Sequence, residues 1–168
     1  MNSGTIAKKI EVGANAGIII VVLLALCLWL TGRWSRQSGS PQTLPVGAKF
    51  ELKGVDWKAN KKSMVLALST TCQFCTESAG FYKELVKKCQ EQHIKVVAVF
   101  PQPQEQAKAY LDGEGVSVDA IRRSSLPDIQ ILGTPTLLVV DDTGTVKAIW
   151  MGKLPSSSEQ QVLASVGT

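Results

Sequence analysis

The sequence predicts an α/β domain built on a mixed β-sheet. Two short Val/Leu/Ile/Ala runs, at residues 63–68 and 94–100, are typical of strands buried on both faces of a parallel sheet. A segment with helical spacing lies between them, so the three form a strand–helix–strand crossover. Residues 136–140 and 145–151 form a later pair of strand-like segments, which adds an antiparallel edge. We therefore expect a central mixed sheet flanked by helices.

The helix of the crossover begins at two cysteines, Cys72 and Cys75. Apolar residues then recur at helical spacing and predict one buried face: Phe74, Phe81, Leu85 and Cys89. Because Cys89 falls on this face, we expect it to be a core residue; a third redox thiol is the alternative.

The second half of the domain alternates in the same way. Pro103 is well placed to begin a helix that runs through Leu111, and the Asp-Gly-Glu-Gly segment at residues 112–115 ends it. Beyond it we expect a short strand near Ser117 and a helical turn over residues 119–122.

The C-terminal elements have clearer signals. Gly144 closes a tight turn between the two final strands and is expected to adopt a positive φ. Ser156 and Glu159 have the spacing of a capping box, which predicts a short terminal helix beginning there.

The N-terminal region predicts one transmembrane helix. Residues 12–30 hold a single strongly polar side chain, and these nineteen residues, at about 1.5 Å each, span roughly the hydrocarbon core of a bilayer. Trp29 and Trp34 suit a membrane interface. We expect an N-terminal tail over residues 1–11 and a membrane anchor over residues 12–34.

A cleaved signal peptide is the rival interpretation, because Lys8 and Lys9 precede the apolar stretch. No small-x-small cleavage site closes that stretch directly, and the nearest candidate, residues 38–40, lies well beyond it. An uncleaved anchor is therefore preferred. Leu26 is too large for a usual lipidation site, so Cys27 is interpreted as an apolar residue facing lipid.

Residues 35–45 are rich in Ser, Gly, Gln and Pro and predict a flexible linker, followed by the folded domain over residues 46–168. Basic residues around the anchor contribute most of the net charge of +4, so nothing in the domain predicts a nucleic-acid partner. Charges on the two sides of the anchor balance. The chain has a short N-terminal tail, one predicted span and a long C-terminal domain. This layout favours an orientation in which the C-terminal domain faces the periplasm or the cell exterior.

Cys72 and Cys75 have the spacing of a redox pair. If a strand ends just before Cys72, that residue begins the helix and Cys75 lies one turn inside, close enough to bridge. Free backbone N–H groups and the helix dipole there stabilise a thiolate. Half of a zinc site is the alternative, and its two further ligands would have to come from Cys27, Cys89 and His93. The redox interpretation is favoured.

Four motifs together resemble the thioredoxin fold. They are Cys-Gln-Phe-Cys at residues 72–75, Gly-Thr-Pro-Thr at 133–136, Asp-Asp-Thr-Gly at 141–144 and Trp-Met-Gly at 150–152. Residues 44–52 resemble the start of the redoxin branch. The anchor and the long segment between residues 100 and 133 are most similar to membrane-anchored thiol-disulfide oxidoreductases of the TlpA and ResA type. The resemblance covers residues 46–166.

The resemblance implies a role for each motif. Cys72 would be the exposed nucleophile and Cys75 the buried thiol that resolves the mixed disulfide. Pro135 would be cis and would place the Thr134 backbone beside the cysteines, where it pairs with an extended substrate; an ordinary strand-entry proline is the alternative.

The implied substrate contacts come from the cis-proline segment and from the residues between the cysteines: Thr134, Pro135, Gln73 and Phe74. The implied partners are protein thiols or disulfides and a membrane electron donor. No metal or organic cofactor is implied.

The chain departs from the family pattern at three positions. Thr71 replaces the usual Trp before the first cysteine, Leu66 replaces the buried acid of thioredoxins, and Ser78 replaces the Glu of the ResA type. Glu77 should point elsewhere on the helix. We therefore expect proton transfer to and from Cys75 to rely on water.

Other functions remain open. One is a non-enzymatic thioredoxin-like binding module in which the cysteines form a structural disulfide. A copper-binding redoxin is a weaker alternative, with His93 as the only histidine. A peroxiredoxin would need Pro at Val65 and Thr at Ser69, so peroxidase activity is not expected.

Overall fold

The computed structural model describes residues 44–167. The predicted tail, the anchor over residues 12–34 and nearly all of the linker lie outside the described residues. Among residues 44–167, no helix is both long and apolar enough to cross a membrane.

A mixed β-sheet forms the centre of the described domain, as the sequence predicts. Its five strands within residues 44–167 are β1 (Lys62–Ala67), β2 (Lys95–Phe100), β3 (Ala120–Arg123), β4 (Thr136–Asp141) and β5 (Val146–Met151), in the spatial order β3-β2-β1-β4-β5. β1 pairs in parallel with β2, and β2 with β3, whereas β4 is antiparallel to both β1 and β5.

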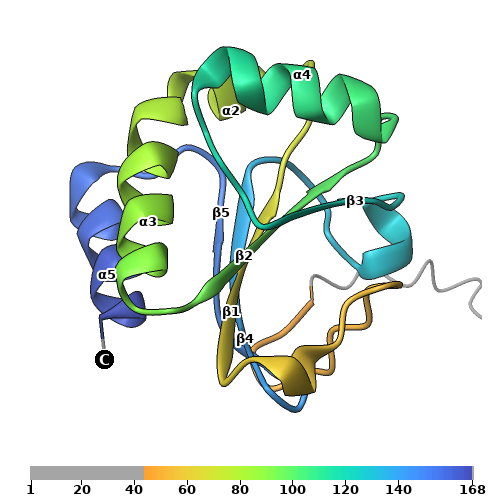
Figure 1. Ribbon diagram of the computed structural model, residues 1–168, viewed down its shortest axis with the longest axis vertical. Coiled ribbons are helices and arrows are strands. Elements are labelled where there is room, and N and C mark those ends of the chain that lie inside the picture. Colours follow the sequence, from red (N-terminus) through yellow and green to blue (C-terminus); the bar gives the residue numbers. More distant parts are fainter. Residues whose placement is uncertain (1–43, 168) are drawn as a thin grey trace, which may run out of the picture. The chain divides into compact units, whose positions relative to one another are not determined.

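Helices cover the sheet (Figure 1). They are α2 (Gln73–Glu77), α3 (Ala79–Glu91), α4 (Gln104–Glu114) and α5 (Ser156–Val166), with short 3₁₀ turns η1 (Trp57–Ala59) and η2 (Pro127–Ile129). α3 and α5 lie side by side along the sheet, and α4 runs across its top in Figure 1. Apolar residues of α3, α4 and α5 share one core cluster, and segments 44–52 and 129–131 cover the other sheet face.

β1 is the central strand that carries the cysteine pair. Its side chains alternate between the two clusters, with Met64 and Leu66 packed under the helices and Val65 and Ala67 on the other face. All four are fully buried. The strand is therefore fixed from both sides, and the turn that follows it has a rigid base.

The prediction for residues 116–123 is wrong. The structure has neither a strand near Ser117 nor a helical turn over residues 119–122; instead β3 begins at Ala120 and pairs in parallel with β2. The pairing supplies partners for the open edge of β2, and Ala120 and Ile121 face opposite clusters, as strand neighbours do.

The predicted capping box is also wrong, because Ser156 is the first residue of α5 and not its cap. The cap is Pro155, whose carbonyl accepts the N–H groups of Ser158 and Glu159 at 2.9 and 3.0 Å. Gly144 has a φ of 76°, which confirms the predicted turn.

The predicted helical stripe is only partly confirmed. Phe81, Leu85 and Cys89 are buried, so the core role of Cys89 is confirmed, but Phe74 is 53 % exposed. Ser78 separates α2 from α3 with a φ of −94° and a ψ of 3°. This break turns Phe74 away from the face that α3 buries.

Candidate active site

A hydrogen-bonded turn connects β1 to the cysteine pair. The Gln102 side chain, which follows β2, donates to Ser69 Oγ at 2.8 Å, and the Ser69 carbonyl accepts the Cys72 N–H at 3.1 Å. Ser69 Oγ also lies 3.1 Å from Thr71 Oγ1. The loops after two neighbouring parallel strands therefore hold the backbone of Cys72 in place.

Cys72 is the N-cap of α2 and is half-buried. Its Sγ accepts the Cys75 N–H at 3.2 Å and lies 3.3 Å from the carbonyl oxygen of Thr134, to which the thiol donates. An N–H group that donates to sulfur stabilises the thiolate, the form that attacks a disulfide. Cys72 is thus both accessible and provided with a donor.

Cys75 lies one turn inside the helix and has no exposed surface. Burial, followed by the hydrogen bond with the Cys72 side chain, raises the pKa of the Cys75 thiol to about 12. Both thiols are free. The pair therefore consists of one accessible sulfur and one enclosed sulfur that stays protonated near neutral pH.

The segment before β4 forms the wall beside Cys72. The Thr134–Pro135 peptide is cis, as the family resemblance implies. The Pro135 carbonyl accepts the Gly152 N–H at 2.7 Å, and Thr136 Oγ1 donates to the Gly133 carbonyl at 2.7 Å. These bonds hold the Thr134 carbonyl against the sulfur of Cys72.

Gln73 and Phe74, between the cysteines, both face solvent. Gln73 donates to Glu77 Oε1 at 2.8 Å, and Lys153 donates to Glu77 Oε2 at 2.6 Å. Lys153, then Gln73, lower the pKa of the Glu77 carboxyl. Glu77 therefore links α2 to the loop after β5. The sequence reasoning missed this link, although the i, i+4 spacing of Gln73 and Glu77 was a visible signal.

Two tyrosines near the cysteine pair were also missed. Tyr110 of α4 packs edge-on against Phe100, with ring centroids 5.9 Å apart, and its hydroxyl lies 3.2 Å from Thr76 Oγ1. Tyr82 of α3 is 2 % exposed and belongs to the same core cluster as Cys75. No local pattern relates Tyr82 to the cysteine pair, because the break at Ser78 interrupts the helical register between Cys75 and Tyr82.

Among the metal ligands considered from the sequence, Cys27 lies outside the described residues, and the structure does not bring His93 to the cysteine pair. His93 follows the C-terminal end of α3, whereas Cys75 precedes its N-terminal end, so a helix of thirteen residues separates them. Within residues 44–167, no three or more His, Cys, Asp or Glu side chains group in a way that could hold a metal ion.

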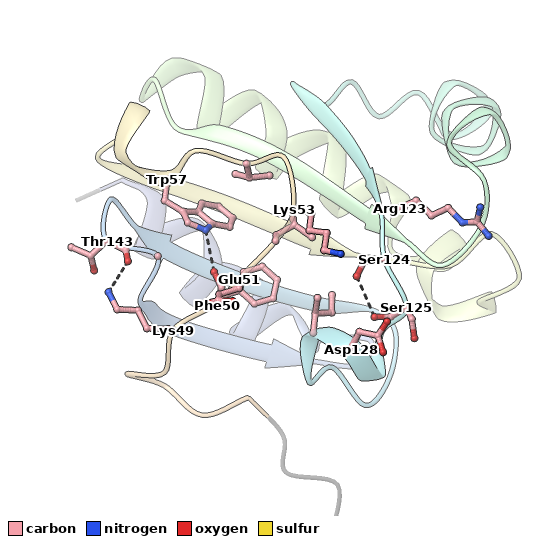
Figure 2. Close-up of a pocket in the computed structure, with 14 residues that line it drawn as sticks. Lys49, Phe50, Glu51, Lys53, Trp57, Arg123, Ser124, Ser125, Asp128 and Thr143 are labelled. Carbon is pink, nitrogen blue, oxygen red and sulfur yellow. Dashed lines mark hydrogen bonds between the residues drawn. The ribbon is translucent and has the colours of Figure 1, made fainter.

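A separate groove of about 990 Å³ lies between the N-terminal segment and the loop after β3 (Figure 2). Trp57 donates to the Phe50 carbonyl at 3.0 Å, and Lys49 donates to the Thr143 carbonyl at 2.6 Å. The lining includes neither cysteine of the pair. The groove is thus distinct from the redox pair, and two of its donors already bond to its own backbone.

The fold and the cysteine pair define the class: this is a thioredoxin-like α/β domain with a Cys-x-x-Cys pair at a strand-to-helix junction. No family model matches the chain. No curated protein matches it in sequence.

Solved structures do match it. A thiol:disulfide interchange protein from Bacteroides sp. has a TM-score of 0.55 at 16% identity, covering 76% of this chain and 90% of that one. A thiol-disulfide isomerase from Corynebacterium glutamicum has 0.53 at 15% identity, covering 76% and 96%. A thioredoxin-family thiol:disulfide interchange protein from Chlorobium tepidum has 0.54 at 16% identity, covering 74% and 98%. At these identities the likeness shows the fold alone.

Proposed function

We propose that the chain is a membrane-anchored thiol-disulfide oxidoreductase that reduces or exchanges disulfides in extracytoplasmic proteins. The observation that carries this proposal is the asymmetry of the pair. Cys72 is half-buried and its sulfur accepts a backbone N–H, while Cys75, one turn away, is fully buried. This arrangement suits a nucleophile and a resolving thiol.

The reaction takes two thiol-disulfide exchanges. The Cys72 thiolate attacks one sulfur of a substrate disulfide, the substrate S–S bond breaks, and the other substrate sulfur leaves as a thiolate. The Cys75 thiolate then attacks the Cys72 sulfur of the mixed disulfide. The second substrate thiolate leaves, and Cys72 and Cys75 end as a disulfide. The protein loses two electrons, which the substrate gains.

Three features support a polypeptide substrate. The cis segment presents Thr134 at the reacting sulfur, so an extended chain can lie along it. Phe74 is more than half exposed between the cysteines and offers an apolar contact. The solved structures of similar fold include proteins named thiol:disulfide interchange proteins.

The cellular setting rests on the sequence. The apolar stretch of residues 12–30 and the linker that follows support an anchor of the TlpA and ResA type, with the domain in the periplasm or outside the cell. A membrane electron donor would then return two electrons to the pair. Protease digestion of intact and opened cells tests this orientation, because only an outward-facing domain is cut in intact cells.

Reduction of insulin disulfides by the full-length protein, with dithiothreitol as the electron source, tests the activity. Cys72→Ser should abolish it, because no thiolate remains to attack the substrate. Cys75→Ser should accumulate mixed disulfides, visible on a non-reducing gel. Cys89→Ser is the matched control and should keep the activity, because Cys89 is buried in the core. Full activity of the Cys72 variant would overturn the proposal.

A further inference from the structure

The ion pair between Glu77 and Lys153 is a charged contact beside the cysteine pair that the proposed function does not use. Lys153 Nζ lies 2.6 Å from Glu77 Oε2, and the two residues are 76 positions apart in the chain. The side chain of Lys153 is 49% exposed and that of Glu77 is 34% exposed. Ion pairs this open to solvent add little to the stability of a fold. Stability therefore does not explain why these two segments are joined.

Each end of the ion pair belongs to one wall of the active site. Glu77 is the last residue of α2, the helix that has Cys72 as its N-cap. Lys153 comes directly after Gly152, whose φ of 82° suits the turn that follows β5. The Gly152 N–H donates to the Pro135 carbonyl at 2.7 Å. The ion pair therefore connects the helix of the cysteines to the segment that precedes β4.

These contacts close into a ring at the reacting sulfur. Pro135 is bonded to Thr134, whose carbonyl oxygen lies 3.3 Å from the Cys72 sulfur. Three non-covalent contacts hold the ring closed: the ion pair, the hydrogen bond from Gly152, and the contact between the Thr134 oxygen and the sulfur. The members of this contact ring are Cys72, Glu77, Lys153, Gly152, Pro135 and Thr134.

The Thr134 carbonyl and the Cys75 N–H have opposite effects on the Cys72 sulfur. The carbonyl accepts a hydrogen bond from the thiol and so stabilises the protonated form, and its partial negative charge repels a thiolate. The Cys75 N–H donates to the sulfur at 3.2 Å and stabilises the thiolate. The balance between thiol and thiolate thus depends on how closely the Thr134 oxygen is held.

We propose that Glu77 and Lys153 are positioning residues whose ion pair holds the Thr134 carbonyl against the Cys72 sulfur and so sets the thiolate fraction of Cys72. The proposal rests on the proposed function, because that thiolate is the attacking group of the first exchange. In this role neither Glu77 nor Lys153 touches the substrate or transfers a proton. Both act through the position of Thr134.

Alkylation of Cys72 by iodoacetamide tests the proposal on the reduced full-length protein, with mass spectrometry of the labelled peptide as the readout. Only the thiolate reacts, so the midpoint of the rate profile over about pH 5 to 9 reports the balance between the two forms. Burial raises the pKa of Cys75, Tyr82 and Tyr110, so these neighbours stay uncharged over that interval. Lys153, then Gln73, lower the pKa of Glu77, which stays charged.

Lys153→Met is the decisive variant, because its two possible effects have opposite signs. Loss of a nearby positive charge would disfavour the thiolate and raise the midpoint. Opening of the contact ring lets the Thr134 oxygen move away from the sulfur and lowers the midpoint. We expect a midpoint lower by about 0.3 to 1 in pH, the range for a weakened or lost hydrogen bond to the thiol.

The double variant Glu77→Ala/Lys153→Met removes both charges together, so direct charge effects largely cancel. It should keep the lowered midpoint of Lys153→Met, because the contact ring is open in both. Lys153→Arg keeps the donor and the charge and should return the midpoint of the parent protein. Melting temperatures should barely change, because the ion pair is partly exposed.

Lys108→Met is the matched control. Lys108 forms an ion pair with Asp112 within α4, at 2.6 Å, and neither residue belongs to the contact ring. The control removes the same kind of charge and should leave the midpoint unchanged. An equal shift in Lys108→Met would refute the proposal, because the effect would then not belong to the ring.

The remaining outcomes are equally clear. A higher midpoint in Lys153→Met, or the parent midpoint in the double variant, would refute the positioning role. A lowered melting temperature with an unchanged midpoint would also refute it, since the pair would then only stabilise the fold. Insulin reduction by the parent protein tests the proposed function separately, because alkylation needs no disulfide substrate.

Discussion

Single-thiol variants should show how strongly burial suppresses the reactivity of Cys75. Cys75→Ser leaves Cys72 as the reactive thiol of the pair, and Cys72→Ser leaves Cys75. Both carry Cys27→Ser. The rise of the Cys75 pKa from 9.0 to about 12 lowers its thiolate fraction near neutral pH by about 10³. Removing Cys72 takes away its hydrogen bond and its charge, which are smaller causes of the raised Cys75 pKa. Burial, the largest cause of that raised pKa, remains.

We therefore expect Cys75 in Cys72→Ser to react with iodoacetamide at least about a hundredfold more slowly than Cys72 in Cys75→Ser near neutral pH. Mass spectrometry of the labelled peptide measures both rates. The Cys75 rate should continue to rise as the pH approaches 12, because only the thiolate is alkylated. Labelling of Cys75 within a factor of about ten of Cys72 would refute the reasoning from burial.

Two further predictions concern stability against pH. Burial raises the pKa of Cys89 from 9.0 to about 11. The contribution of the protonated Cys89 thiol to the stability of the fold is therefore complete below pH 9 and is lost as the pH rises toward 11. Cys89→Ala should therefore lose less stability than the parent over that interval in urea unfolding. Hydrogen bonds from Thr143 and Thr145 hold the pKa of Asp141 well below its usual range. The contribution of the Asp141 carboxylate to the stability of the fold is therefore present at neutral pH and is lost in acid. Asp141→Asn should melt lower at neutral pH, with a difference that shrinks as the pH falls; a constant difference would contradict this.

The sequence predicts the centre of the fold well because buried strands have a strong local signal. β1, β2 and β4 are runs of apolar residues that lie between two apolar layers, so each run identifies its strand without knowledge of its partners. The turn at Gly144 has an equally local cause. Cys72 and Cys75 are found in the same way, because both their spacing and the strand before them are visible in the chain.

The wrong predictions concern segments whose structure depends on distant partners. β3 is a four-residue edge strand with two arginines, and it becomes a strand because β2 offers it an unpaired edge. Phe74 has the spacing of a buried residue, but the break at Ser78 exposes it. Local periodicity does not reveal either effect.

The support around the cysteine pair is likewise not local. Gln102 reaches Ser69 from a different loop, and Lys153 reaches Glu77 from the loop after β5. Each contact joins residues more than thirty positions apart. The motif at residues 72–75 therefore predicts the reacting atoms but not the groups that hold them in place.

Burial of Cys75 creates a kinetic problem that its position can offset. Leu66 and Leu68 belong to the core cluster that includes Cys75, and neither side chain can take its proton. Because burial raises the pKa of Cys75, its thiolate is a small minority near pH 7. Well-oriented intramolecular reactions have effective molarities of about 10⁵–10⁸ M, and a thiolate of higher pKa is a stronger nucleophile. Because Cys75 lies one turn from Cys72, proximity can compensate for the small thiolate population.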